Sequence, residues 1–213
     1  MKMQKRMVVL GSCLLLAVQA KAVTVFNLNA ADLTDQNGAL LSQNAIALIV
    51  LDANSNGFDA VTPTSSLTVG GALSGGDDLV IAKFDLSAPG INGALINTFT
   101  VTYGGSVSSG DPFKLYWFPS LTTSSTQVGS GTYYGSYTDA VGNNSAAWVL
   151  PNDTGAQLDL NMGTPNNGIG VVVNITAEMG KATLQTIPEP SSALLVGLSA
   201  CGAFALIDPC IIQ

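Results

Sequence analysis

The chain is 213 residues long, with 47% hydrophobic and 10% charged residues and a formal net charge of −7. It contains no histidine, so neither a Ser-His-Asp triad nor the histidine ligands of many zinc hydrolases can be present. Its cysteines are Cys13, Cys201 and Cys210, which leaves residues 14–200 without a disulfide or a thiolate metal site.

The first 22 residues have the three parts of a secretory signal peptide: a positive start, an apolar run and a cleavage site with small residues. These parts are Lys2, Lys5 and Arg6, then residues 7–18, then Ala20 and Ala22. We predict that the mature chain begins near Val23. An alternative takes Leu10 to Cys13 as a lipobox with a lipidated cysteine, although the unbroken apolar run ahead of it is only residues 7–10.

Residues 23–186 then form one domain of ordinary size, large enough for a single core. The domain carries 12 acidic and three basic residues, a net charge of −9. Phosphate binding depends on clustered Lys and Arg, so nucleic acid is excluded as a partner. The same sign of charge disfavours an anionic membrane surface.

Short segments of β-type sequence recur through this domain and predict strands. They are residues 23–28, 45–51, 66–69, 79–86, 95–103, 113–118, 132–137, 146–150, 157–160, 169–176 and 182–186. In residues 97–103, Phe99 and Val101 alternate with threonines, which indicates one buried and one solvated face. Val80, Ala82, Phe84 and Leu86 show the same period. We predict an all-β fold, an antiparallel two-sheet sandwich of the jelly-roll or immunoglobulin-like type.

An acidic loop follows the second predicted strand. Asp52, Asn54 and Asn56 alternate, and Gly57 stands at the sixth position, as in the opening D-x-N-x-N-G of a calcium loop. Pro63 at the twelfth position excludes an EF-hand. A shorter calcium site could be completed by other acids, namely Asp59, Asp77 and Asp78. The alternative is an Asn/Gly-rich turn without metal.

Aromatic residues gather in the second half of the domain. Exposed rings on a sandwich can stack against sugars, and the candidates are Tyr133, Tyr134, Tyr137 and Trp148. The alternative is that the aromatic residues of this half pack in the core, with Phe113, Leu115 and Trp117 inside and Tyr116 on the other face of its strand.

We predict that the protein is not an enzyme. A two-carboxylate glycosidase is the mechanism that the composition leaves open. Glu178 is the one glutamate of the domain, so any such pair needs at least one Asp, and no motif selects one.

The last 27 residues, 187–213, differ from the domain. Pro188 and Pro190, on either side of Glu189, interrupt regular structure, and residues 193–207 are an uncharged apolar run. As a helix this run spans about 22 Å, less than the roughly 30 Å of a hydrocarbon core. It predicts a short transmembrane helix, with a buried core helix as the alternative.

The order Pro188, Glu189, Pro190 and apolar run resembles the PEP-CTERM sorting signals of Gram-negative bacteria that produce exopolysaccharide. The resemblance implies that an exosortase-like enzyme recognises this motif and removes the helix after a transient stay in the inner membrane. Sorting signals of that family usually end in Arg or Lys, whereas residues 208–213 contain neither. Membrane retention here would rest on hydrophobicity alone.

Together these features predict an exported, non-enzymatic protein of the cell surface or extracellular matrix. The alternative is a carbohydrate-binding module associated with exopolysaccharide, followed by a calcium-dependent adhesion module. No cofactor is expected apart from the candidate calcium ion.

Overall fold

The computed structural model describes residues 22–30, 32–74, 76–86, 92–139, 148–152, 155, 157–162 and 185–186. These residues contain nine strands and no helix, so the prediction of an all-β fold is confirmed. Within this part of the chain no helix is long and apolar enough to cross a membrane. The predicted signal peptide, except for Ala22, and the predicted sorting tail lie outside the described residues.

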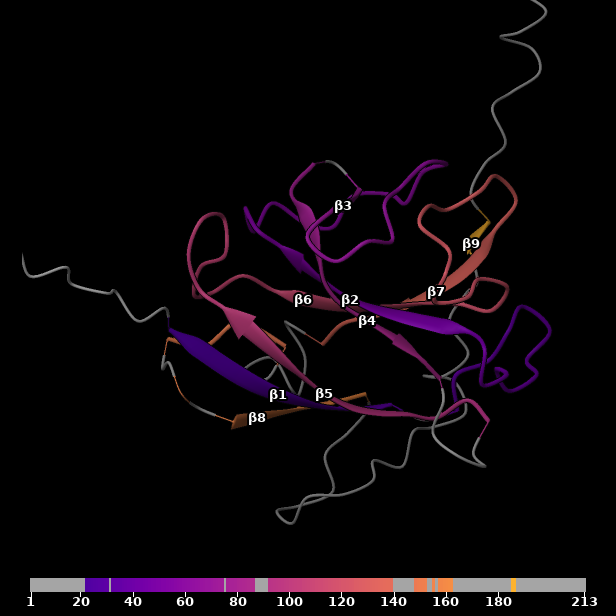
Figure 1. Ribbon diagram of the computed structural model, residues 1–213, viewed down its shortest axis with the longest axis horizontal. Helices are drawn as coiled ribbons and strands as arrows, with labels where there is room; N and C mark the ends of the chain where they lie inside the picture. The colour runs from indigo at the N-terminus through magenta and orange to yellow at the C-terminus, as the bar shows by residue number, and fades with distance from the viewer. Residues whose placement is uncertain are drawn as a thin grey trace, which may run out of the picture.

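The strands form two sheets, drawn as a lower and an upper layer in Figure 1. The three-stranded sheet has the order β5 (Leu95–Thr102), β1 (Val23–Ala30) and β8 (Gln157–Asn161). The six-stranded sheet has the order β3 (Ala72–Ser74), β4 (Asp78–Asp85), β2 (Ile46–Asp52), β6 (Phe113–Phe118), β7 (Tyr133–Tyr137) and β9 (Gln185–Thr186). All pairings are antiparallel except that of β1 with β8.

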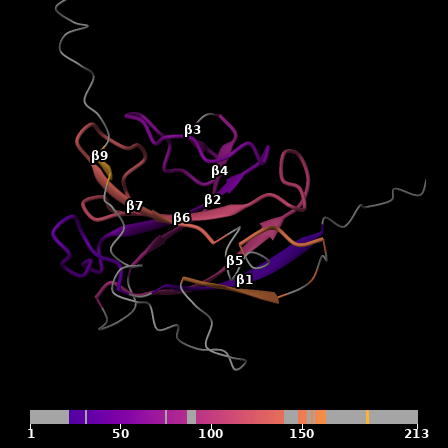
Figure 2. The same cartoon turned by 180° about the vertical axis from the view of Figure 1, so that it is seen from behind.

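The two sheets face each other across the main core, and Figure 2 shows the same two layers from behind. Phe26 of β1 stacks on Phe99 of β5, with ring centroids 5.2 Å apart. Phe113 of β6 meets Phe26 edge-on at 4.9 Å. Since these rings come from both sheets, they join the layers in the manner of a β-sandwich.

A second core lies on the opposite face of the six-stranded sheet. Two chain segments cover this face: residues 53–71, which we call the covering segment, and residues 121–128. The covering segment is the purple chain near β3 in Figure 1. The two segments are joined to each other by backbone hydrogen bonds, among them Leu67 N–H to Thr126 O at 2.9 Å. Strand β2 is therefore buried on both faces. The strand alternation in the sequence favours antiparallel sheets with one solvated face, and this is wrong for β2 because the two segments replace water on that face.

Strand β4 contains one extra residue relative to β2. Ile49 pairs with Ala82 and Val50 pairs with Val80, so Ile81 bulges out of the ladder. Val80 consequently packs in the second core, whereas Ala82 packs in the main core. The predicted common face for residues 80, 82, 84 and 86 is wrong for this reason.

Candidate functional site

Buried acids meet at one end of the six-stranded sheet. Asp52 ends β2 and Asp78 begins β4 directly opposite it, and both side chains are fully buried. Asp111, just before β6, is 4% exposed. The sheet holds these acids together because antiparallel pairing places the end of one strand beside the start of the next. We call Asp52, Asp78 and Asp111, with the loop at residues 53–59, the acidic end.

Asp52 organises the loop that follows it. Its Oδ1 accepts the backbone N–H groups of Asn54 and Asn56, both at 3.3 Å, and its Oδ2 accepts that of Gly57 at 2.8 Å. The loop turns tightly, since Ser55 and Gly57 have φ values of 52° and 103°. The alternation of Asp and Asn seen in the sequence thus corresponds to a loop wrapped around one carboxylate.

Asp78 has one satisfied and one unsatisfied oxygen. Its Oδ2 accepts Ser74 Oγ–H at 2.7 Å and the backbone N–H of Asp59 at 2.8 Å. Its Oδ1 is buried and has no hydrogen-bond partner. Burial raises the pKa of this carboxyl, and the charges of Asp52 and Asp77 raise it further. The ionised form of Asp78 is therefore destabilised by its surroundings in the folded protein.

One lysine lies beside the acidic end. Lys114 Nζ sits 5.1 Å from the ring centroid of Phe58 and 5.3 Å from that of Tyr116. Burial lowers the pKa of this ammonium, and the negative charge of Asp78 opposes that effect. Lys114 thus offsets part of the local charge, while its contacts are mainly with aromatic rings.

The six residues predicted for calcium come to this same end. Besides the contacts already given, Asn54 Nδ2 donates to Asp77 Oδ2 at 3.2 Å. Among the described residues, however, no group of three or more Asp, Glu, His or Cys side chains is placed to hold a metal ion. Any metal site here must therefore be completed by neutral oxygens.

The candidate sugar-binding aromatics do not form an exposed platform. Trp148 is fully buried in the main core, and Tyr137 packs edge-on against it with centroids 5.3 Å apart. Tyr134 is buried in the second core beside Tyr116. Only Tyr133, at 38% exposed, is an exposed member of the four. The prediction of a platform is wrong because alternating residues of β7 contribute to two different cores.

The alternative prediction, that aromatic residues of β6 pack in the core, is confirmed for the residues expected inside. Phe113, Leu115 and Trp117 line the main core, and Tyr116 faces the other way. Tyr116 is nevertheless buried, because the covering segment lies over it.

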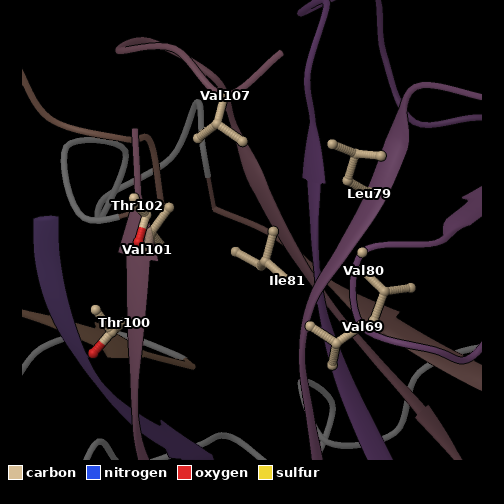
Figure 3. Close-up of a pocket in the computed structure, with 9 residues that line it drawn as sticks. Val69, Leu79, Val80, Ile81, Thr100, Val101, Thr102 and Val107 are labelled. Atoms are coloured by element: carbon tan, nitrogen blue, oxygen red, sulfur yellow. The ribbon is translucent and has the colours of Figure 1, made fainter. Parts of the chain in front are cut away.

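An apolar groove opens between β4 and β5, with a volume of about 200 Å³. Val101 and Ile81 lie on its two sides and Val107 above them, as Figure 3 shows. Its lining contains no charged residue, so it offers no acid or base for catalysis. The glycosidase alternative needed two Asp, or one Asp with Glu178, facing each other across a cleft; no Asp lines this groove, and Glu178 lies outside the described residues.

Sequence reasoning missed Asp111 of the acidic end, and it missed two residues that interact with Asp78, namely Ser74 and Lys114. Asp111 stands 59 positions after Asp52, and no local pattern connects them. The fold brings them together, since Asp52 N–H donates to Pro112 O at 3.1 Å. Ser55 Oγ–H reaches Asp111 Oδ1 at 3.5 Å.

No protein-family model, curated protein or solved structure matches this chain. The function is therefore inferred from its residues and from their arrangement.

Proposed function

We propose that this is an exported, non-enzymatic protein of the cell surface or extracellular matrix, sorted through its C-terminal tail. The signal-peptide pattern of residues 1–22 carries the export step. The motif Pro188, Glu189 and Pro190, followed by the short apolar run, carries the sorting step. An exosortase-like enzyme is the partner, and the inner membrane holds the tail transiently.

One structural observation supports removal of the leader. Strand β1 begins at Val23, immediately after the predicted cleavage site. In the described part of the chain, the buried hydrophobic residues run from Phe26 to Met162. Ala22 contributes its carbonyl oxygen, which accepts the Tyr103 N–H at 3.0 Å. Cleavage after Ala22 would cost that hydrogen bond and leave the described core intact.

The composition of the domain is compatible with an extracellular location. It contains no cysteine that could be oxidised and carries a net charge of −9, which favours solubility. The solvent side of the three-stranded sheet carries short polar contacts, such as Asn27 Nδ2 to Asp159 Oδ1 at 2.8 Å.

The sorting step is tested by changing its motif in the native host. We expect a double variant, Pro188→Ala with Pro190→Ala, to stay in the membrane fraction with its tail attached. The matched control is Ser191→Ala, which changes the adjacent residue and should be processed like the unmodified chain. Equal processing of the double variant and the control would remove the basis of the sorting proposal.

A further inference from the structure

We propose that the acidic end of the six-stranded sheet binds one calcium ion, with Asp78 Oδ1 as a ligand. This inference goes beyond the proposed function and does not depend on it.

The first observation is the unsatisfied oxygen. A buried polar atom without a partner costs about 1–3 kcal/mol, and more when it is charged, so native structures leave few of them. Asp78 is fully buried, and its Oδ2 already accepts two hydrogen bonds. Its Oδ1 has none. An atom in this position normally contacts an ordered water or an ion.

The second observation is the charge around that oxygen. Asp52 lies directly opposite Asp78 on the neighbouring strand, so the two carboxyl groups share one face of the sheet. Like charges at opposite positions destabilise a sheet. Asp77 adds a third carboxylate from the adjacent position. Lys114 offsets part of this charge but makes no hydrogen bond to Oδ1. A cation at Oδ1 would relieve the remaining repulsion and satisfy the oxygen together, whereas a water would do only the second.

The loop supplies the remaining oxygens. Asn54 uses its Nδ2 to bond Asp77, which leaves its Oδ1 as an acceptor. Asp52 Oδ1 accepts two N–H groups at 3.3 Å, which are long hydrogen bonds for a carboxylate. The site would therefore combine the carboxylates of Asp52 and Asp78 with amide, backbone or water oxygens.

This ligand chemistry selects calcium. The domain offers neither histidine nor cysteine, so the donors are all oxygens and the softer transition metals are disfavoured. Calcium accepts six to eight oxygens in irregular arrangements, whereas magnesium demands near-octahedral geometry. With two carboxylates the affinity should be low, a Kd of about 0.1–1 mM, as in extracellular calcium modules.

The test uses the exported protein, purified and dialysed against EDTA. We expect calorimetric titration with CaCl₂ to show one site per chain, and MgCl₂ at the same concentrations to show at least about tenfold weaker binding. Calcium should also raise the melting temperature, because it binds the folded state. No calcium binding up to about 10 mM, far above the Kd expected of such a module, would overturn the proposal and assign the oxygen to a water.

Variants locate the site. Asp78→Asn and Asn54→Ala should each weaken calcium binding at least about tenfold, the effect of losing a charged or a neutral ligand. Asn54 is exposed, so its truncation should leave the fold intact. The control is Asp32→Asn, which removes one charge at an exposed position whose φ of 53° asparagine tolerates. Unchanged calcium affinity in both site variants would also overturn the proposal. Because these are measurements on purified protein, their failure would leave the sorting proposal standing.

Discussion

Replacing Gly135 with alanine should strongly destabilise the domain. Gly135 of β7 pairs with Trp117 of β6, and the indole ring lies across the glycine. A Cβ built at Gly135 would stand 2.2 Å from Cε2 of that ring, whereas ordinary contacts begin near 3.4 Å. The ring would have to move by more than an ångström, although it is fully buried in the main core.

Two costs combine in this substitution. Overpacking a core costs about 1–3 kcal/mol. Movement of the indole also endangers the hydrogen bond from Trp117 Nε1 to Thr34 O, 3.2 Å long and worth about 1 kcal/mol. The free energy of unfolding should therefore fall by about 2–4 kcal/mol.

Urea unfolding followed by tryptophan fluorescence measures this loss. The matched control is Gly129→Ala, because a Cβ there meets only Thr132 Oγ1, at an ordinary 3.7 Å. We expect the control to stay within about 0.5 kcal/mol of the unmodified protein. If both variants unfolded at the same urea concentration, the packing of Trp117 against β7 would be refuted.

Three further results follow from the two cores and from the acidic end. Leu67 in the covering segment is fully buried, so Leu67→Ala should lower the free energy of unfolding by about 2–4 kcal/mol. The control Val69→Ala changes a side chain that is 56% exposed and should alter the free energy of unfolding by less than about 0.5 kcal/mol. Equal urea midpoints for the two variants would show that the segment does not cover the sheet. Burial raises the pKa of the Asp111 carboxyl above its ordinary value of 3.8. At pH values above the folded-state pKa, the buried carboxylate therefore lowers the stability of the folded protein, and this effect disappears as the pH falls below 3.8. Asp111→Asn loses a carboxylate oxygen that accepts hydrogen bonds, such as that from Ser108 N–H to Oδ2, and this loss is independent of pH. Its stability relative to the unmodified protein in EDTA should therefore be higher at pH 7 than near pH 3.8, as urea unfolding at successive pH values would show, and a relative stability that grows on acidification would contradict this reasoning. The two tryptophans of the chain, Trp117 and Trp148, are fully buried in the main core, so iodide should quench little of the native emission; strong quenching would show that the main core is open.

Local period explains which strands could be predicted from sequence. Strand β5 alternates between exposed and buried residues from Thr98 to Thr102, and the predicted bounds of β6 match the observed ones. Strand β3 was missed because it has three residues and too little pattern to detect. The bulge at Ile81 was also missed, since it depends on how β4 pairs with β2. The predicted strand at residues 169–176 lies outside the described residues.

The covering segment shows a different limit of sequence reasoning. Val61 stands among polar and small residues without a regular period. The strand predicted at residues 66–69 does not form, and Ser66 makes only an isolated bridge to Gln127. The burial of Val61 and Leu67 follows from the tertiary fold, which lays residues 53–71 over the six-stranded sheet. The same covering decides that Tyr116 and Tyr134 are core residues rather than sugar-binding rings.

One part of the acidic end could be predicted from the sequence and another part could not. Asp52 and its loop form a local motif, and hydrogen bonds from the loop to that carboxylate appear in the structure. The participation of Asp111 and Lys114 required knowledge of which strands are neighbours. The unsatisfied oxygen of Asp78 has no sequence signature at all, because it depends on the burial of one atom.

Export followed by tail removal is the central claim, and intact mass spectrometry of the protein from cells and medium of its native host tests it most directly. We predict a chain that begins at Val23 and ends near Pro188. A chain that keeps residues 1–22, or one that still extends to Gln213 in the medium, would contradict the claim.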